Sequence, residues 1–525
     1  MWGSAIQNAI RRSKAADLPL LLFIVGVTNV KLYVKVAAAV LYLIYFLYKK
    51  YPLRQPLKGV GTFYLAMPLA GIAGSVIQGA FNDANYRYVF LFGTGLWLLA
   101  GAVSWLIYMS ASRISTDALS ATLKAFFVLN FLVSLGQLIY IMIDSRQLMP
   151  YWYSVAGGKY GISTGDYIKG VTGNTSVVNG VITSLGALFF YFRKQWRWLA
   201  ICLLTMVLCT TNLTFLCFLL ILVVIIISAR GQRLSATLLM LTTIGLYWVV
   251  SPDNMIYIGQ VFQRLVYGRQ EGPLSAMQLY YKEHREAFFK VNVRDGIYCN
   301  YWQELAAVRA ASLTDSTKQH NSLSAGVLDT TIKRWYGIPA DSTPLHFVNG
   351  PGKIYAFKQA LFYGLSDGRR SLIGAGIGNF SSLLAIKATG LGIEGHYPDR
   401  YTYAAKSYFD YHLYDVLYYF SRSESEHSVM NMPDNVYAQL IGEYGLVGVL
   451  VLLFYYLGYF FRQRKRIGYS RYILCLTLLF FGYGYWFEMI SLTVFFELLM
   501  FMDIFAAERT NGVSPIPDNS LDAGI

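Results

Sequence analysis

Several side chains that can do acid–base chemistry lie together in residues 427–453, HSVMNMPDNVYAQLIGEYGLVGVLVLL. The stretch begins with polar residues, among them His427, Asp434 and Asn435, and then becomes apolar while still carrying Glu443. A histidine or a carboxylate can act as a general base, and a charge within an apolar stretch is by default a functional candidate. Structural interpretations stay open: His427 as a loop residue, Asp434 and Asn435 as a helix cap, and Glu443 as a brace for a neighbouring helix.

A second candidate site is the glycine-rich stretch DGRRSLIGAGIGNF, residues 367–380. A dinucleotide-binding loop needs a preceding strand, a following helix and a downstream acidic residue, and the sequence shows none of this context. Two interpretations remain. Gly374 and Gly376 form a close-packed turn at a helix start, or their backbone N–H groups bind an anion beside Arg369 and Arg370.

Three further basic residues precede or follow apolar stretches: Lys169 in IKGVTGN, Arg264 in FQRLVYG and Lys353 in PGKIYAFKQAL. Each is expected near a membrane face, where a single basic side chain ordinarily reaches to lipid headgroups. If several of them converged on one diphosphate, they would form a binding site.

The elements that must position these residues are membrane helices. The chain has 525 residues, of which 55% are hydrophobic and 14% charged, and the apolar residues form long blocks. The net charge of +15 comes largely from short basic clusters between these blocks, as in cytoplasmic loops that face anionic lipid, so no nucleic-acid partner is expected. The expected spans are 18–30, 32–48, 60–80, 87–109, 125–143, 177–192, 198–211, 213–228, 235–252, 436–461, 472–487 and 490–507.

With the N-terminus inside, alternation of these twelve spans places every basic cluster and both termini in the cytoplasm. The predicted organisation is a membrane bundle over 1–252 with an outer loop at 144–176, a large and mostly helical outer domain over 253–435, three spans over 436–507 and a cytoplasmic tail over 508–525. All six histidines fall in the outer domain, so any chemistry is expected on the outer face.

The sequence predicts no cofactor and no metal site, because no histidine or cysteine grouping has the spacing of metal ligands. Four of the five cysteines lie in apolar blocks, so no disulfide framework is expected.

Three segments together resemble the superfamily of O-antigen ligases and Wzy-type polysaccharide polymerases. The segment DNVYAQLIGEYGLVGVLVLL is similar to the His-Asn motif, leucine-rich stretch and Glu-x-Gly that close the family's outer loop. Upstream, GKIYAFKQALFYGLSDGRRSLIGAGIGNF resembles the family segment with a basic residue, an Ala-Leu pair and a Gly-x-Gly turn, and IKGVTGNTSVVNG is a weaker match. The resemblance implies an all-α integral membrane protein of the GT-C-like type with about twelve transmembrane helices.

The resemblance also implies a metal-independent, inverting glycosyltransferase that uses a polyprenyl-diphosphate-linked (in bacteria, undecaprenyl) glycan. Asp434 stands where the family has histidine and becomes the first candidate for the base, with His427 as the second and Glu443 as an orienting group. Lys169, Arg264 and Lys353 are expected to bind the diphosphate, with Arg369 and Arg370 as second choices. Gly374, Gly376, Asn435 and Gly445 are expected to shape the site.

This chain has Lys169 and Lys353 where the family usually has arginine, and lysine lacks the bidentate fork of arginine. These departures favour a polymerase of O-antigen, capsule or exopolysaccharide over a ligase that transfers glycan to lipid A core. A transporter or flippase is the alternative from another class. The implied partners are the lipid-linked donor and acceptor, membrane lipids, a chain-length regulator and a flippase, and the implied location is the bacterial cytoplasmic membrane with the active site on its outer face.

Overall fold

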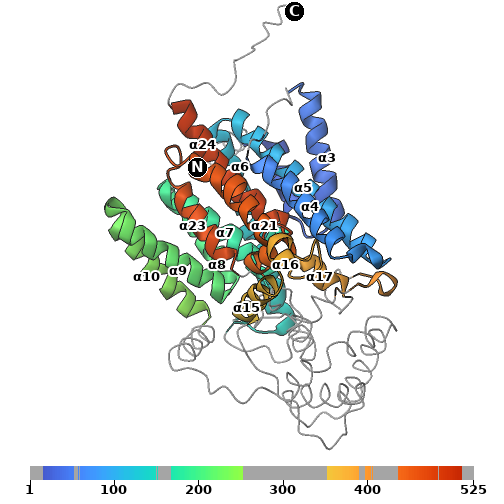
Figure 1. Cartoon of the computed structure of the whole chain (residues 1–525). Coiled ribbons are helices and arrows are strands. Elements are labelled where there is room, and N and C mark those ends of the chain that lie inside the picture. The colour runs from blue at the N-terminus through green and yellow to red at the C-terminus, as the bar shows by residue number, and fades with distance from the viewer. Residues whose placement is uncertain are drawn as a thin grey trace, which may run out of the picture.

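The computed structural model describes residues 16–51, 57, 59–148, 150, 151, 167–251, 352–389, 397–403, 405, 435–482 and 484–510. Every regular element in this part of the chain is a helix, and the helices pack side by side into one bundle (Figure 1). This is the architecture expected of apolar segments in a bilayer, since a helix satisfies its own backbone hydrogen bonds.

Six helical segments are long and apolar enough to cross a membrane, and six shorter apolar helices accompany them. The long segments are α4 (Val60–Ile77), α5 (Tyr86–Arg113), α6 (Thr116–Ser145), α10 (Arg233–Val250) with the turn before it, the composite helix Val436–Arg462, and α24 (Ile490–Thr510). The shorter helices are α2 (Leu18–Thr28), α3 (Leu32–Tyr48), α7 (Ser176–Phe192), α8 (Trp196–Leu208), α9 (Asn212–Ser228) and α23 (Ser470–Phe480).

Each expected span coincides with one of these twelve apolar helices, but their ends differ. α6 begins at Thr116 rather than at 125, and α23 ends at Phe480 rather than at 487. Residues 481–489 therefore form a non-helical connection from α23 to α24, except for residue 483, which lies outside the described part. The expectation of helix over 481–487 is wrong.

α24 occupies the centre of the bundle and is buried along nearly its whole length. It contacts α2, α5, α7 and α23. Glu497 of α24 is buried and accepts hydrogen bonds from the hydroxyls of Tyr64 (2.7 Å) and Tyr456 (3.0 Å). A carboxyl group between helices is thereby satisfied by two phenol donors, which buried polar groups require.

The helix connections gather at two ends of the bundle. At one end, Arg509 near the end of α24 donates to Thr116 at the start of α6 and to the carbonyls of Ala111 and Ser112 at the end of α5. The basic turn, defined here as residues 462–469, lies at this same end, because Arg466 forms an ion pair with Glu508. We call this the basic end.

The opposite end holds α15 (Gly352–Leu365), α16 (Gly368–Ile373) and α17 (Leu383–Ala388) (Figure 1). Residues 374–382, which we call the glycine loop, connect α16 to α17 and pack between α4, α5 and the composite helix. Side chains of this loop and of α17, such as Ile377 and Leu384, belong to the bundle's own hydrophobic core. This described part of the predicted outer domain is therefore built into the bundle.

Candidate functional site

The composite helix is interrupted close to its start. It consists of α20 (Val436–Gln439), the π-helical turn η9 (Leu440–Tyr444), α21 (Gly445–Val451), a second π-helical turn η10 (Leu452–Leu457) and α22 (Gly458–Arg462). Gly445 has φ +60°, which ends the regular turn after Tyr444. π-Helical turns occur frequently at functional sites, and irregular backbone at membrane depth has to be satisfied by surrounding protein.

The glycine loop satisfies this interruption. The N–H groups of Ala375 and Gly376 donate to the carbonyls of Gly442 and Glu443, each at 2.8 Å. The Tyr86 hydroxyl of α5 donates to the Ile377 carbonyl at 2.9 Å and fixes the other side of the loop. The loop and the broken helix thus form one rigid unit.

Two glycines of this loop have no room for a side chain. A Cβ on Gly374 (φ +74°) would lie 2.6 Å from the Tyr444 nitrogen, and one on Gly376 (φ +90°) would lie 2.5 Å from the Ser75 nitrogen in α4. A Cβ on Gly445 would lie 2.7 Å from the Gly374 nitrogen. These three positions pack directly against backbone and require glycine. At the end of the loop, Ser382 is the N-cap of α17.

Glu443 is buried and holds the glycine loop through its side chain. Its Oε1 accepts from the Phe380 N–H at 3.3 Å. The Gly378 N–H and the side chains of Ser382 and Gln439 also face the carboxylate. All of these partners are neutral, so the described role of Glu443 is to tie the loop to the broken helix.

Asn435 begins the composite helix as its N-cap, and its Oδ1 accepts from the Ala438 N–H at 2.9 Å. The next residue, Val436, donates its N–H to the Phe481 carbonyl at 3.1 Å, which joins the start of this helix to the end of α23. Asp434 immediately precedes this cap in the sequence and lies outside the described residues, as do His427 and Arg264.

Arg370 of α16 packs on two stacked aromatic rings, the second of which belongs to the glycine loop. Its guanidinium lies 5.2 Å from the ring centroid of Tyr363 in α15, and that ring stacks on Phe380 of the glycine loop at 4.4 Å. Its Nε–H has no hydrogen-bond partner among the described residues. Arg369 is exposed, and its backbone N–H donates to the helix cap Asp367.

The helix that carries Lys353 packs on the start of the composite helix. α15 contacts α16, α20 and η9, and its residues Ala360 and Tyr363 share a small apolar cluster with Phe380 and Ala438. Lys353 lies in the first turn of α15, and its side chain falls outside the described part. The structure therefore brings the helices of Lys353, Arg369 and Arg370 to the broken helix.

Lys169 lies elsewhere at the same end. It precedes the short helix η3 (Gly170–Thr172), which the side chains of three residues fix: Asn130 accepts from Val171, Gln137 accepts from Gly170, and Asn179 donates to Ile168. The main contacts of η3 are with α2, α6 and α7. Lys169 is half-buried and has no acidic partner among the described side chains, but α16 is not among the elements on which this segment mainly packs.

Sequence reasoning missed Glu488, which lies in the connection between α23 and α24. Its Oε2 accepts from the Leu383 N–H at 2.7 Å at the start of α17. Burial, followed by the nearby Glu443 carboxylate, raises the pKa of Glu488 to about 8, and the Lys387 ammonium opposes this shift. The sequence does show a carboxylate directly after the expected span 472–487. Because that span was expected to be an uninterrupted helix, the sequence did not indicate that Glu488 lies near the glycine loop.

An apolar hollow of about 410 Å³ lies beside this unit, at the outer surface of α5. Tyr88, Phe92, Tyr397 and Tyr401 line it, together with one leucine and one proline, and the rings of Tyr88 and Tyr401 lie 4.3 Å apart. The guanidinium of Arg400 lies 4.6 Å from the Tyr401 ring, so a cation flanks the hollow.

The glycine loop and the broken helix, with Arg370 and the apolar hollow beside them, combine fixed backbone, a cation and apolar surface. This combination suits a ligand with a phosphate group and a lipid chain. Within the described ranges, no three His, Cys, Asp or Glu side chains group as metal ligands would. Comparison with known protein families, with curated proteins and with solved structures finds no match to this chain.

Proposed function

We propose that this protein is a polysaccharide polymerase that transfers a polyprenyl-diphosphate-linked glycan onto a sugar hydroxyl of another lipid-linked unit at the outer face of a bacterial cytoplasmic membrane. The observation that carries the proposal is the seating of the α15–α16 pair, with Lys353, Arg369 and Arg370, on the interrupted helix that starts at Asn435. These are the segments in which the sequence resembles the polymerase and ligase superfamily, and the fold brings two of the three together.

The arrangement of the connections supports the proposed topology of twelve spans. Turns assigned to the cytoplasm contact one another, as in the Arg466–Glu508 ion pair and the hydrogen bond from Arg509 to Thr116. Turns assigned to the outside also contact one another, as in the hydrogen bond from Leu383 to Glu488. A bundle whose helices alternate in direction produces this separation.

In the proposed reaction, the acceptor hydroxyl attacks the anomeric carbon of the donor and inverts it. The bond from that carbon to the diphosphate oxygen breaks, and the lipid diphosphate leaves with the electron pair. Asp434 takes the hydroxyl proton, with His427 as the second candidate. Lys169, Arg264 and Lys353, with Arg370 held at the broken helix, neutralise the charge that develops on the leaving group.

The apolar hollow at the surface of α5 supports a lipid-linked donor. Leu91, which lines it, is 66% exposed on a helix long enough to span the membrane, so the hollow opens where lipid chains would lie. Tyr397 at its inner wall donates its backbone N–H to the Lys387 carbonyl at 3.0 Å, which connects the hollow to the glycine-loop region.

The test is glycan transfer by the purified protein with its cognate lipid-diphosphate glycan. A ladder of growing glycan is expected, and it should be lost in Asp434→Asn and Lys353→Gln while Lys194→Gln, in the turn between α7 and α8, retains it. Each variant should elute as the parent does in size-exclusion chromatography. Transfer only to an added lipid A core would instead make the protein a ligase.

A transporter is the second candidate, because transporters of lipids and ions use interrupted helices and the composite helix is interrupted. In those proteins the interruption lies near the membrane midplane. Here the break that the glycine loop satisfies, at η9 and Gly445, lies within the first ten residues of the helix, and η10, nearer mid-bundle, contains no residue with positive φ. Flipping of the same lipid-linked glycan in liposomes, without transfer to any acceptor, would establish the transporter and exclude the polymerase.

A further inference from the structure

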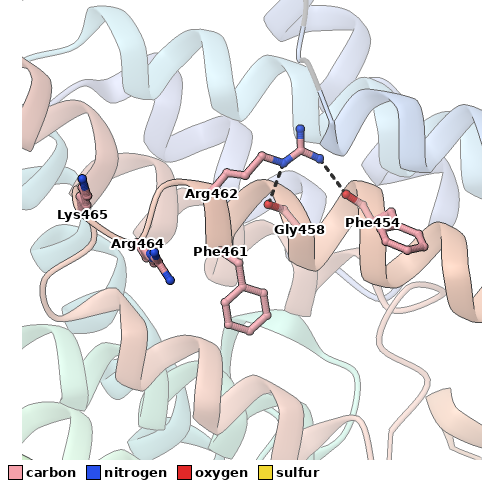
Figure 2. A pocket seen from close by; sticks show the side chains of 6 residues that line it. All are labelled: Phe454, Gly458, Phe461, Arg462, Arg464 and Lys465. Carbon is pink, nitrogen blue, oxygen red and sulfur yellow. Dashed lines mark hydrogen bonds between the residues drawn. The ribbon is translucent and has the colours of Figure 1, made fainter.

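A hollow of about 650 Å³ lies at the basic end of the composite helix, opposite the glycine loop (Figure 2). Its lining combines two aromatic residues and one glycine from the helix with three cations at and after its end. These residues are Phe454, Gly458, Phe461, Arg462, Arg464 and Lys465. None of the described residues that line it is a carboxylate.

The position of Arg462 is fixed by the second π-helical turn. Its Nη2 donates to the Phe454 carbonyl at 2.9 Å and its Nε to the Gly458 carbonyl at 3.2 Å, so the guanidinium lies back along the helix (Figure 2). A π-helical turn shifts the backbone hydrogen bonds by one residue, and Arg462 supplies donors to carbonyls around that shift. A Cβ on Gly458 would lie 2.9 Å from the Leu453 carbonyl oxygen, so the backbone at this position leaves no room for a side chain.

The neighbouring charges of the basic turn differ in whether they are neutralised. Arg466 pairs with Glu508. Arg464 and Lys465 are exposed and have no acidic partner among the described residues. Together with Arg462 they give the hollow an uncompensated positive charge, which favours an anionic occupant.

The apolar part of the hollow favours an occupant that also has a hydrocarbon chain. Phe454 is 62% exposed and Phe461 54% exposed, on a helix of a length and composition that cross a membrane. The exposed aromatic rings lie on the helix, and Arg464 and Lys465 follow its end. This order matches that of acyl chain and headgroup in a lipid leaflet.

We propose that this hollow binds an anionic phospholipid of the cytoplasmic leaflet. Arg464 and Lys465, with Arg462, face its phosphate groups, and Phe454 and Phe461 flank an acyl chain that passes over Gly458. The three cations spread over the turn instead of pointing to one position (Figure 2), which suits a headgroup with two phosphates, as in cardiolipin. The inference is independent of the proposed glycan transfer.

The experiment compares lipid retention by the purified full-length protein in native mass spectrometry, with cardiolipin as the probe and phosphatidylcholine as the neutral lipid. The parent should retain cardiolipin in preference to phosphatidylcholine. The double variant Arg464→Gln/Lys465→Gln should bind cardiolipin roughly 30-fold more weakly, given about fivefold for each basic residue near a lipid surface.

The matched control, Lys194→Gln/Arg197→Gln, removes two charges at the same end, one from the turn between α7 and α8 and one from the first turn of α8. This control should retain cardiolipin as the parent does, and soluble glycerol phosphate should not displace the lipid. The proposal is overturned if the 464/465 variant keeps parental cardiolipin binding, or if both double variants lose it equally. Equal retention of phosphatidylcholine by the parent would overturn it as well. Thermal unfolding curves of both double variants, recorded without added lipid, should match that of the parent. The four substituted side chains are all exposed, and three of them lie in turns, the exception being Arg197 in α8.

Discussion

At the scale of single residues, Glu488 makes the stability of the protein depend on pH. Its pKa is raised from the ordinary 4.5 to about 8, mainly by burial. Between these values the folded protein keeps a proton that the unfolded chain has released, so the free energy of unfolding falls as pH rises through this window. Glu488→Gln keeps an oxygen to accept the Leu383 N–H and removes the titration.

We therefore expect the melting temperature of the parent in detergent to fall between about pH 5 and about pH 8, and that of Glu488→Gln to fall less. Because the Glu443 carboxylate lies near Glu488, the difference between the two proteins reports the titration of Glu488 together with its interaction with Glu443. If the melting temperatures of the two proteins fell by the same amount between these pH values, the assignment to Glu488 would be contradicted.

Arg370 and Arg369 are adjacent but differ in how firmly they are held. Arg370 lies over the Tyr363 ring and keeps an Nε–H without a partner in the described structure, whereas Arg369 is exposed. A cation held in place loses less conformational entropy when it meets a developing charge. Arg370→Gln should reduce kcat/KM for glycan transfer by about 10²-fold, the scale for a lost transition-state donor, and Arg369→Gln by less than about tenfold. Equal losses in the two variants would argue against a fixed role for Arg370.

At the scale of elements, the glycine loop can only take its path if it lacks side chains. Gly376→Ala places a methyl group against the Ser75 backbone and forces alanine to a φ of +90°. The left-handed conformation costs a non-glycine residue about 1–2 kcal/mol, and overpacking costs about 1–3 kcal/mol. We expect a loss of about 2–5 kcal/mol in the free energy of unfolding.

Gly368→Ala is the matched control, because a Cβ at Gly368 meets nothing within 4 Å. It should leave the melting temperature within about 1 °C of the parent, as for a surface substitution. If Gly376→Ala were as stable as Gly368→Ala, the loop would not be packed against α4 as described.

The positions of the helices were predictable from the sequence because each is specified locally. A run of apolar residues has to become a helix in a bilayer, and the twelve expected spans each coincide with an apolar helix. The early end of α23 at Phe480 was not predictable from hydropathy, since residues 481–487 are apolar, and in the structure Phe481 and residues 484–487 are buried by packing without being helical. The pairing of Gly376 with Glu443 likewise joins residues far apart in the chain, and hydropathy contains no information on it.

The candidate site shows the same division. The sequence identified Asn435, Glu443 and Gly445 as a unit because they are neighbours in one segment, and the fold connects that unit to Gly374 and Gly376. Convergence of separate cations is a tertiary property. Convergence with the other cations could be proposed for Lys169 from residue type alone, but the main contacts of the segment around Lys169 are with α2, α6 and α7.

At the scale of the whole molecule, the two ends of the bundle differ in what their connections contain. The glycine-loop end holds tightly packed backbone, two acids and the proposed site, whereas the basic end holds short turns with uncompensated cations. The buried Glu497 joins them at mid-bundle by binding the hydroxyls of Tyr64 in α4 and Tyr456 in η10.

The separation of the two ends can be tested with single cysteines in a cysteine-free background. Asp83→Cys between α4 and α5 and Gly368→Cys at the start of α16 lie at the glycine-loop end and are exposed. Lys194→Cys and Arg464→Cys are exposed at the basic end. In bacterial spheroplasts a membrane-impermeant maleimide should label the first pair directly and the second pair only after permeabilisation, because basic turns stay in the cytoplasm. Direct labelling at Arg464→Cys would invert the composite helix and place the glycine loop, with the proposed site, on the cytoplasmic side, where a polymerase of outer-leaflet glycans has no substrate.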